Sequence, residues 1–139
     1  MPDVHMPGPA TAADGTSYII KFDPATQIIH ARLTGFWDKS AFDGFGVDVQ
    51  KFLVASRQQL GFARVLLDRR DSPVQSPEFA EAIRVQGLTL YNPNNYIAVV
   101  LASTLAQMQL QRIVADTRTH QFMDMGEAEA WLRAQGAAA

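Results

Sequence analysis

The stretch ARVLLDRRDSPVQSPEF, from Ala63 to Phe79, contains three kinds of segment in succession. The run ARVLL, Ala63–Leu67, is short and mostly apolar, which is typical of a strand buried on both faces of a sheet. The charged residues from Asp68 to Asp71 predict the end of that strand and a loop. Ser76 and Pro77 form a common helix start, because serine caps free amides and proline suits the first helical position. Strand, loop and helix in this order are typical of an α/β domain.

Before this stretch, two β-rich runs flank a short polar turn. YIIKF (Tyr18–Phe22) and IIHARLTG (Ile28–Gly35) predict an antiparallel hairpin. Apolar residues then recur mostly at spacings of three, four and seven, which predicts a helix with one apolar face. We expect Asp38 or Ser40 to cap its start and Gly61 to end it.

After this stretch, helices and strands continue to alternate. A helix is expected at Pro77–Leu90, and the run YIAVVLA, Tyr96–Ala102, should be a central strand. Ser103 caps a third helix, His120–Met123 forms a last short strand, and Asp124 caps the final helix in a pattern completed by a glutamate three residues later. The predicted order is ββαβαβαβα, a mixed β-sheet opened by an N-terminal hairpin and flanked by helices.

The composition suits one globular domain with one core. The chain has 139 residues, of which 47% are hydrophobic and 19% charged. Residues 18–135 are expected to form the domain, residues 1–17 a flexible arm and residues 136–139 a frayed end. The formal net charge of -2, with scattered basic residues, argues against nucleic acid as a partner.

Location is also limited by the sequence. No apolar run approaches the ~20 residues that a membrane span needs. The start of the chain has neither a basic nor an apolar segment of the kind that a secretory signal contains. Cysteine is absent, which excludes disulfides, thiol catalysis and cysteine-ligated metal. We therefore expect a cytoplasmic protein of bacterial type.

The order of elements resembles the STAS domain fold and, more narrowly, the SpoIIAA-like group of small bacterial proteins. The resemblance covers Tyr18 to Leu132, and the segments that carry it are LTGFWDKSAF, RVLLD, IAVVLASTLAQMQLQR and HQFMDMGEAEAWL. It implies a mixed sheet flanked by helices, no intrinsic cofactor, and a role in regulation or recognition.

The resemblance also implies a candidate phosphorylation site at Ser76. In anti-sigma-factor antagonists, a serine at the start of the second helix is phosphorylated by a partner kinase, and Ser76 occupies about that position. A phosphate there would be favoured by the free amides of the helix. The Asp-Ser-Ser-Gly signature of that family is absent, however, and Pro77 stands where a serine or glycine would be expected. Ordinary helix capping by Ser76 is the alternative.

A candidate recognition patch follows the predicted strand. Asp68, Arg69 and Arg70 lie at its carboxyl end, where ligands of open α/β sheets tend to bind. Ser72 lies in the same predicted loop. The patch could contact a partner's charged groups, or it could be a solvated loop with weak ion pairs.

Trp37 is the second candidate contact with a protein partner. It lies between the second predicted strand and the first helix. Tryptophan is enriched at interface hot spots, which would make Trp37 an anchor beside Arg69 or Arg70. The alternative is a hydrophobic staple that fixes the entry of the chain into the helix.

No catalytic or metal-binding constellation is present in the sequence. His5, His30 and His120 are not spaced as metal ligands, and no nucleophile elbow or glycine-rich phosphate loop occurs. We therefore expect a protein that is not an enzyme and needs no cofactor.

Two functions remain open. The first is a non-catalytic regulatory or protein-recognition module. The alternative is a carrier of a small apolar, lipid-like ligand held in a pocket between sheet and helices, suggested by the surplus of apolar residues on the first and third predicted helices. Both are compatible with a homodimer, because a short edge strand or an apolar helix face favours a two-fold contact.

Overall fold

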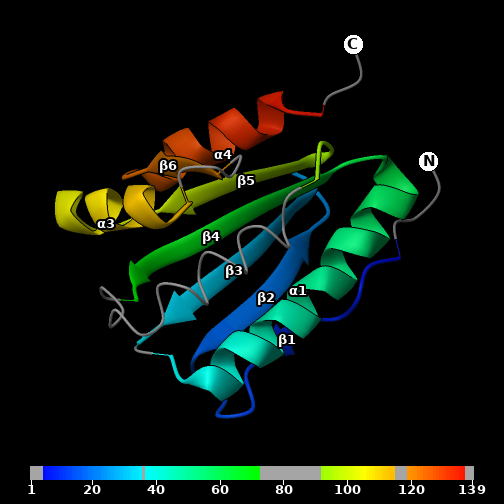
Figure 1. Cartoon of the computed structure of the whole chain (residues 1–139). Coiled ribbons are helices and arrows are strands. Elements are labelled where there is room, and N and C mark those ends of the chain that lie inside the picture. Colours follow the sequence, from blue (N-terminus) through cyan, green and yellow to red (C-terminus); the bar gives the residue numbers. More distant parts are fainter. Residues whose placement is uncertain (1–4, 36, 73–91, 115–118, 137–139) are drawn as a thin grey trace.

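The computed structural model describes residues 5–35, 37–72, 92–114 and 119–136. Within them, six strands form one mixed sheet whose spatial order follows the order of the chain (Figure 1). The strands are β1 (Ala10–Thr11), β2 (Tyr18–Asp23), β3 (Ile28–Thr34), β4 (Ala63–Asp71), β5 (Asn95–Val100) and β6 (Thr119–Phe122). The pairs β1–β2 and β2–β3 are antiparallel, and the pairs from β3 to β6 are parallel. This confirms the predicted mixed sheet with an opening hairpin.

Three helices lie in the described residues: α1 (Lys39–Leu60), α3 (Thr104–Val114) and α4 (Met125–Ala134). Figure 1 shows α1 crossing the sheet beside β2 and β3, and α4 lying near β5 and β6. Because successive strand residues point to opposite faces, the sheet buries two separate apolar clusters. One cluster joins the sheet to α1 and the other joins it to α4. The helix predicted at Pro77–Leu90 lies outside the described residues.

The predicted helix ends are confirmed where the structure describes them. The Asp38 carboxylate accepts a hydrogen bond from the Ala41 amide at 2.9 Å, and α1 ends at Gly61 with a φ of 83°. Ser103 Oγ accepts a hydrogen bond from the Ala106 amide at 3.1 Å, directly before α3 begins at Thr104. Asp124 caps α4 in the same way, accepting from the Glu127 amide at 2.9 Å. In each case a side-chain oxygen or a left-handed residue satisfies free backbone groups.

The N-terminal segment contains a strand that the sequence pattern does not predict. Within residues 1–17, taken as an arm, Ala10 and Thr11 form β1 and pair with β2. The turn from β1 to β2 is held by the Asp14 carboxylate, which accepts hydrogen bonds from the Thr16 and Ser17 amides at 2.8 and 2.9 Å. The hydrogen bond from the Ser17 hydroxyl, together with these two from the amides, lowers the pKa of Asp14 to about 2. The described part of this segment is therefore an edge of the sheet.

Candidate functional site: a charged face of the sheet

The candidate recognition patch lies in a strand rather than in a loop. β4 continues to Asp71, so Asp68, Arg69 and Arg70 have strand geometry, which corrects the prediction that the strand ends at Asp68. The charged residues extend the strand because β3 pairs with it up to Thr34, opposite Asp71. Backbone pairing with a neighbouring strand thus overrides the low strand propensity of aspartate.

A β-bulge near the end of β4 determines which way its charged side chains point. Arg32 of β3 lies opposite Asp68, whereas Thr34 lies opposite Asp71. Two residues on β3 therefore match three on β4, and the extra residue turns Asp71 toward the face that already carries Asp68. Bulges of this kind commonly re-aim side chains near functional sites.

Two ion pairs form side by side on that face. Arg32 contacts Asp71, with Nη2 2.5 Å from Oδ2. Arg70 reaches back to Asp68, where Nε donates to Oδ1 and Nη2 to Oδ2, each at 2.9 Å. Both pairs join a planar guanidinium to a carboxylate, the geometry that gives charge-assisted hydrogen bonds their directionality.

Hydrogen bonding favours the charged forms of Asp68, Arg32 and Arg70. Burial opposes ionisation of Asp68, but the hydrogen bonds from Arg70 outweigh it and lower the pKa of Asp68 below its ordinary value. The hydrogen bond to Asp71 raises the pKa of Arg32, and that to Asp68 raises the pKa of Arg70. The face therefore presents fixed charges of both signs.

The same face continues onto β2. Lys21 pairs in register with His30, and His30 is two residues from Arg32 on β3, so all three side chains share one face. We call this surface the charged sheet face and define it by Lys21, His30, Arg32, Asp68, Arg70 and Asp71. Among the described elements, α4 packs on this side of the sheet mainly against β4, β5 and β6, and its apolar cluster includes β3 at Ile28, the first residue of that strand.

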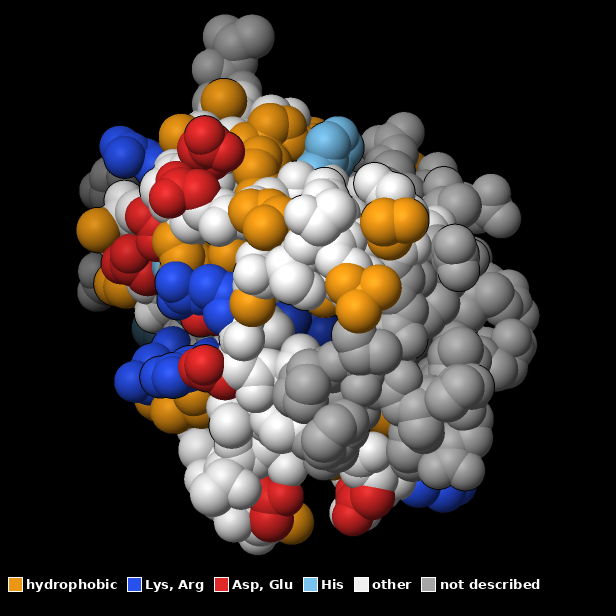
Figure 2. Space-filling view, turned by 90° about the vertical axis from the view of Figure 1, so that its left-hand side faces the viewer, with side chains coloured by type: hydrophobic (Ala, Val, Ile, Leu, Met, Phe, Trp, Pro, Cys, Tyr) orange, Lys and Arg blue, Asp and Glu red, His pale blue; other side chains and the backbone are white. Residues whose placement is uncertain are grey.

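A view onto the end of the molecule where β4 terminates shows this pattern of charge. Figure 2 shows basic and acidic side chains interspersed on the left of the described surface. Neither sign forms a large uniform area there. The surface is therefore suited to a partner with charges of both signs rather than to a polyanion.

Trp37 is not part of this surface. It is 4% exposed, and its indole Nε1 donates to the Ser17 carbonyl at 3.1 Å. Its ring lies 5.2 Å from that of Phe42, which is one turn into α1. This is the hydrophobic staple given above as the alternative for Trp37. The prediction that Trp37 is an exposed anchor for a protein partner is therefore wrong.

Ser72 is also buried, which corrects its expected place in an exposed loop. It is 7% exposed, and its Oγ donates to the Gly35 carbonyl at 3.1 Å. Ser72 therefore joins the end of β4 to the end of β3. Ser76, the candidate phospho-acceptor, lies outside the described residues.

Lys21, His30 and Arg32 belong to the face but were not predicted as site residues. A signal for them exists in the sequence. In IIHARLT, Ile28–Thr34, polar side chains at His30, Arg32 and Thr34 alternate with apolar ones, and such alternation indicates a strand with one accessible face.

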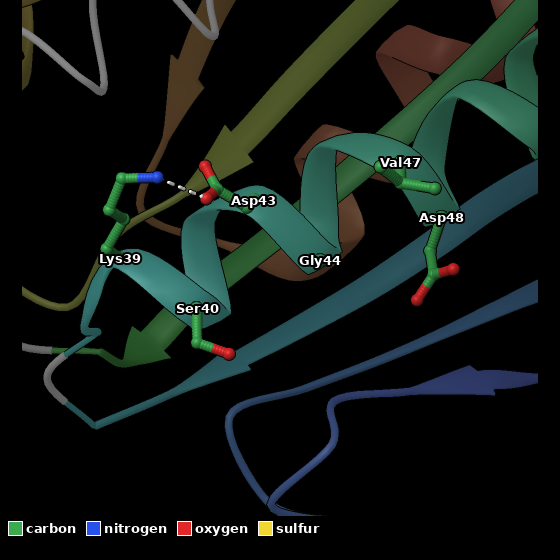
Figure 3. A pocket seen from close by; sticks show the side chains of 6 residues that line it. All are labelled: Lys39, Ser40, Asp43, Gly44, Val47 and Asp48. Carbon is green, nitrogen blue, oxygen red and sulfur yellow. Dashed lines mark hydrogen bonds and ion pairs between the residues drawn. The ribbon is translucent and has the colours of Figure 1, made fainter.

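A second surface feature is a pair of adjoining hollows beside the first half of α1. One, of about 560 Å³, lies between α1 and the turn that follows β1, and the other lies along the outer side of α1. Figure 3 shows the outer hollow, with Lys39 and Asp43 joined to each other and with Ser40 and Asp48 on the opposite side of the helix.

The carboxylates that line these hollows already have partners. Asp43 pairs with Lys39 at 2.7 Å, and Asp48 accepts from the Tyr18 hydroxyl at 2.7 Å. Asp38 caps α1 and Asp14 holds the turn after β1. Among the described residues, no group of three or more His, Asp or Glu side chains is placed to hold a metal ion. The hollows are therefore accounted for by structural contacts.

None of the helices in the described ranges has the length and apolar character needed to cross a membrane. No family model matches the chain, and no curated protein matches it. Several solved structures are similar, among them an uncharacterized protein of the DUF3478 family, with a SpoIIAA-like fold, from Shewanella loihica PV-4. This chain and that protein share 14% sequence identity and a TM-score of 0.55, over 95% of the first and 99% of the second. The chain has the SpoIIAA-like fold.

Proposed function

We propose that this chain is a non-catalytic recognition module of regulatory type that binds a protein partner through the charged sheet face. The observation that carries the proposal is the pair of ion pairs, Arg32–Asp71 and Arg70–Asp68, which a β-bulge brings side by side. They lie at the carboxyl ends of parallel strands, where α/β proteins place their binding residues.

The Arg32–Asp71 ion pair has little to contribute to the stability of the fold. The side chains of Arg32 and Asp71 are 62% and 49% exposed. Exposed pairs typically contribute about 0–1 kcal/mol, because solvent screens them and ordering long side chains costs entropy. Charges of this kind contribute more to the specificity and rate of association with a partner.

The geometry gives less support to the alternative, a carrier of an apolar ligand. Such a carrier needs a chamber lined mainly by apolar side chains. The two hollows beside α1 open to solvent, and charged residues stand along them among small and apolar ones: Asp14, Asp38, Lys39, Asp43 and Asp48. Within the described residues, the charged sheet face is therefore the better-supported site.

An exchange of charges tests the proposal without removing the ion pair. In the double variant Arg32→Asp with Asp71→Arg, the pair is retained but the pattern presented to a partner is reversed. The matched control exchanges Lys39 and Asp43, an exposed pair on α1. Each protein is immobilised, and proteins retained from the cells of origin are quantified by mass spectrometry.

We expect at least one protein to be retained both by the wild type and by the α1 control. The retained amount of that protein should fall about tenfold or more on the Arg32/Asp71 exchange. This is the loss that a charge reversal worth ~1.4 kcal/mol or more causes at an interface. The free energy of unfolding of both exchanged variants should lie within about 1 kcal/mol of the wild-type value. Equal retention by all three proteins would contradict the proposal.

A further inference from the structure

Arg69 stands apart from the charged sheet face. Leu67 belongs to the apolar cluster under α1 and Asp68 to the opposite face, so strand alternation places Arg69 on the α1 side of the sheet. Its guanidinium makes no hydrogen bond or ion pair with any residue in the described ranges. The side chain keeps some contact with solvent, but the surrounding protein lowers the pKa of Arg69 to about 10 by desolvation. It is a cation at neutral pH for which the described residues provide no counter-charge.

Gln121 on β6 has a complementary deficiency. Its Oε1 has no contact with solvent and no hydrogen-bond partner within the part of the chain that the structure describes. An enclosed amide oxygen without a donor costs about 1–3 kcal/mol relative to a satisfied one. Such atoms are uncommon in native folds, and each suggests a missing water, ion or ligand.

The register of the sheet places both groups on the same face. Gln121 lies beside Val99 of β5, and Val99 lies beside Leu67 of β4. Arg69 is two residues beyond Leu67, so strand spacing puts its Cα about 12 Å from that of Gln121. Leu101, which follows β5, is 4% exposed and belongs to the same apolar cluster. Long side chains at this separation can grip one small molecule from two ends.

We propose that Arg69 and Gln121 form a binding site for a small oxyanion that carries a proton, with the phosphate group as the ligand class. A guanidinium donates to anionic oxygens, often in bidentate fashion. Gln121 Oε1 can only accept, so the ligand must also offer an O–H. Hydrogen phosphate and phosphate monoesters in their monoanionic form offer both, whereas sulfate at neutral pH has no proton to donate.

This site is independent of the proposed recognition surface, since the two lie on opposite faces of the sheet. It is tested by thermal unfolding of the full chain at pH 6.5 in sodium phosphate and in sodium sulfate at matched ionic strength. The variants are Arg69→Met and Gln121→Leu, and the control is Arg133→Gln, which removes an exposed cation from α4. The same series with glycerol 3-phosphate distinguishes free phosphate from a phosphate ester.

We expect phosphate to raise the unfolding temperature of the wild type and of Arg133→Gln more than sulfate does, with about tenfold tighter apparent binding, the usual effect of one hydrogen bond to a charged group. In Gln121→Leu the ratio of the apparent affinities for phosphate and for sulfate should fall to about one. Without ligand, this variant should unfold at a higher temperature than the wild type, because the unpaired oxygen is gone. In Arg69→Met both anions should lose their effect.

A stronger effect of the ester than of free phosphate would identify a phosphorylated molecule as the ligand, and the reverse would identify the free anion; both support the site. Equal effects of phosphate and sulfate on the wild type would overturn the proposal, as would a phosphate preference that survives in Gln121→Leu. The Gln121→Leu comparison decides the question alone if Arg69→Met does not fold. The charge exchange at Arg32 and Asp71 has no bearing on this outcome.

Discussion

At Gly44 two effects of opposite sign meet on a single residue. Glycine inside a helix is about 1 kcal/mol less favourable than alanine. A Cβ at this position, however, would lie 2.9 Å from the hydroxyl oxygen of Tyr18. That hydroxyl cannot move away easily, because it donates to Asp48 at 2.7 Å and its ring packs against Phe45. The glycine thus allows β2 to approach α1 closely.

We predict that Gly44→Ala destabilises the wild type by about 1–2 kcal/mol, because overpacking outweighs the gain in helix propensity. In the Tyr18→Phe background the same change should be neutral or stabilising by up to ~1 kcal/mol, since the next ring atom, Cζ, is 3.8 Å from the added Cβ. Chemical denaturation of the four proteins in this double-mutant cycle measures the coupling. Equal effects in both backgrounds would show that the hydroxyl is not the obstacle.

The Tyr18 hydroxyl also predicts a dependence of stability on alkaline pH. Burial first, and then the hydrogen bond to Asp48, raise the pKa of Tyr18 above its ordinary value of 10.0. The unfolded chain therefore releases this proton at lower pH than the folded chain. The resulting stabilisation is complete below pH ~10 and is lost as pH rises above it, by about 1.4 kcal/mol per pH unit.

The measurement is the free energy of unfolding between pH 8 and 11.5 for the wild type and for Tyr18→Phe. The difference between them should be constant up to pH ~10 and then shift in favour of the phenylalanine variant. Parallel curves over the whole range would mean that Tyr18 titrates normally in the folded protein.

At the scale of the elements, Arg64 fastens α4 and the opening hairpin to the sheet. Its guanidinium donates to three backbone carbonyls: Nε to Gln135 at 2.9 Å, Nη1 to Thr26 at 2.8 Å and Nη2 to Arg133 at 3.3 Å. Arg133 lies in the last turn of α4 and Gln135 is its C-cap, so two of these carbonyls lie at the helix end where the helix dipole favours cations. The residue is 7% exposed, so little water is available to replace these bonds.

We predict that Arg64→Met destabilises the fold by about 2–3 kcal/mol, because it removes hydrogen bonds from a charged donor to three backbone carbonyls. The rate of backbone amide hydrogen exchange should increase more in α4 than in α1. Arg133→Met is the control, since the Arg133 side chain is exposed. Burial lowers the pKa of Arg64, and the charge of Arg133 lowers it further. That variant should be neutral or slightly stabilising, and a comparable loss in both variants would argue against a specific role for Arg64.

Local signals explain which elements could be predicted. Asp38, Gly61, Ser103 and Asp124 mark helix ends through their own backbone neighbourhood, so sequence is enough to find them. β1 has only two residues, Ala10 and Thr11, and no strand pattern, because it forms by pairing with β2. Its existence depends on a neighbour rather than on its own residues.

The site could be predicted only in part for a related reason. The charge of Asp68, Arg69 and Arg70 is evident in the sequence, but the side on which each lies depends on a bulge set by pairing with β3. Trp37 shows the same limit. An aromatic residue before a helix can be a staple or an anchor, and the contacts of Trp37 with the rings of Tyr18, Phe42 and Phe45 decide between the two.

At the scale of the whole molecule, the two faces of the sheet differ in kind. One face is covered by α1 over an apolar cluster. On the other face, α4 packs mainly on β4, β5 and β6. The remaining area is the charged sheet face, on which Lys21 and Arg32 are exposed. The resemblance to the structure from Shewanella loihica establishes the fold, and the proposed function rests on the two ion pairs that lie in this remaining area.

The most direct test is site-specific photo-crosslinking in the cells of origin. A photoreactive residue is placed at Lys21, within the charged sheet face, and in a second protein at Lys51, an equally accessible lysine on α1. The account predicts covalent adducts with a discrete protein from position 21 and none of that mass from position 51. Adducts that are the same from both positions, or that form only from position 51, would contradict the charged sheet face as the recognition surface.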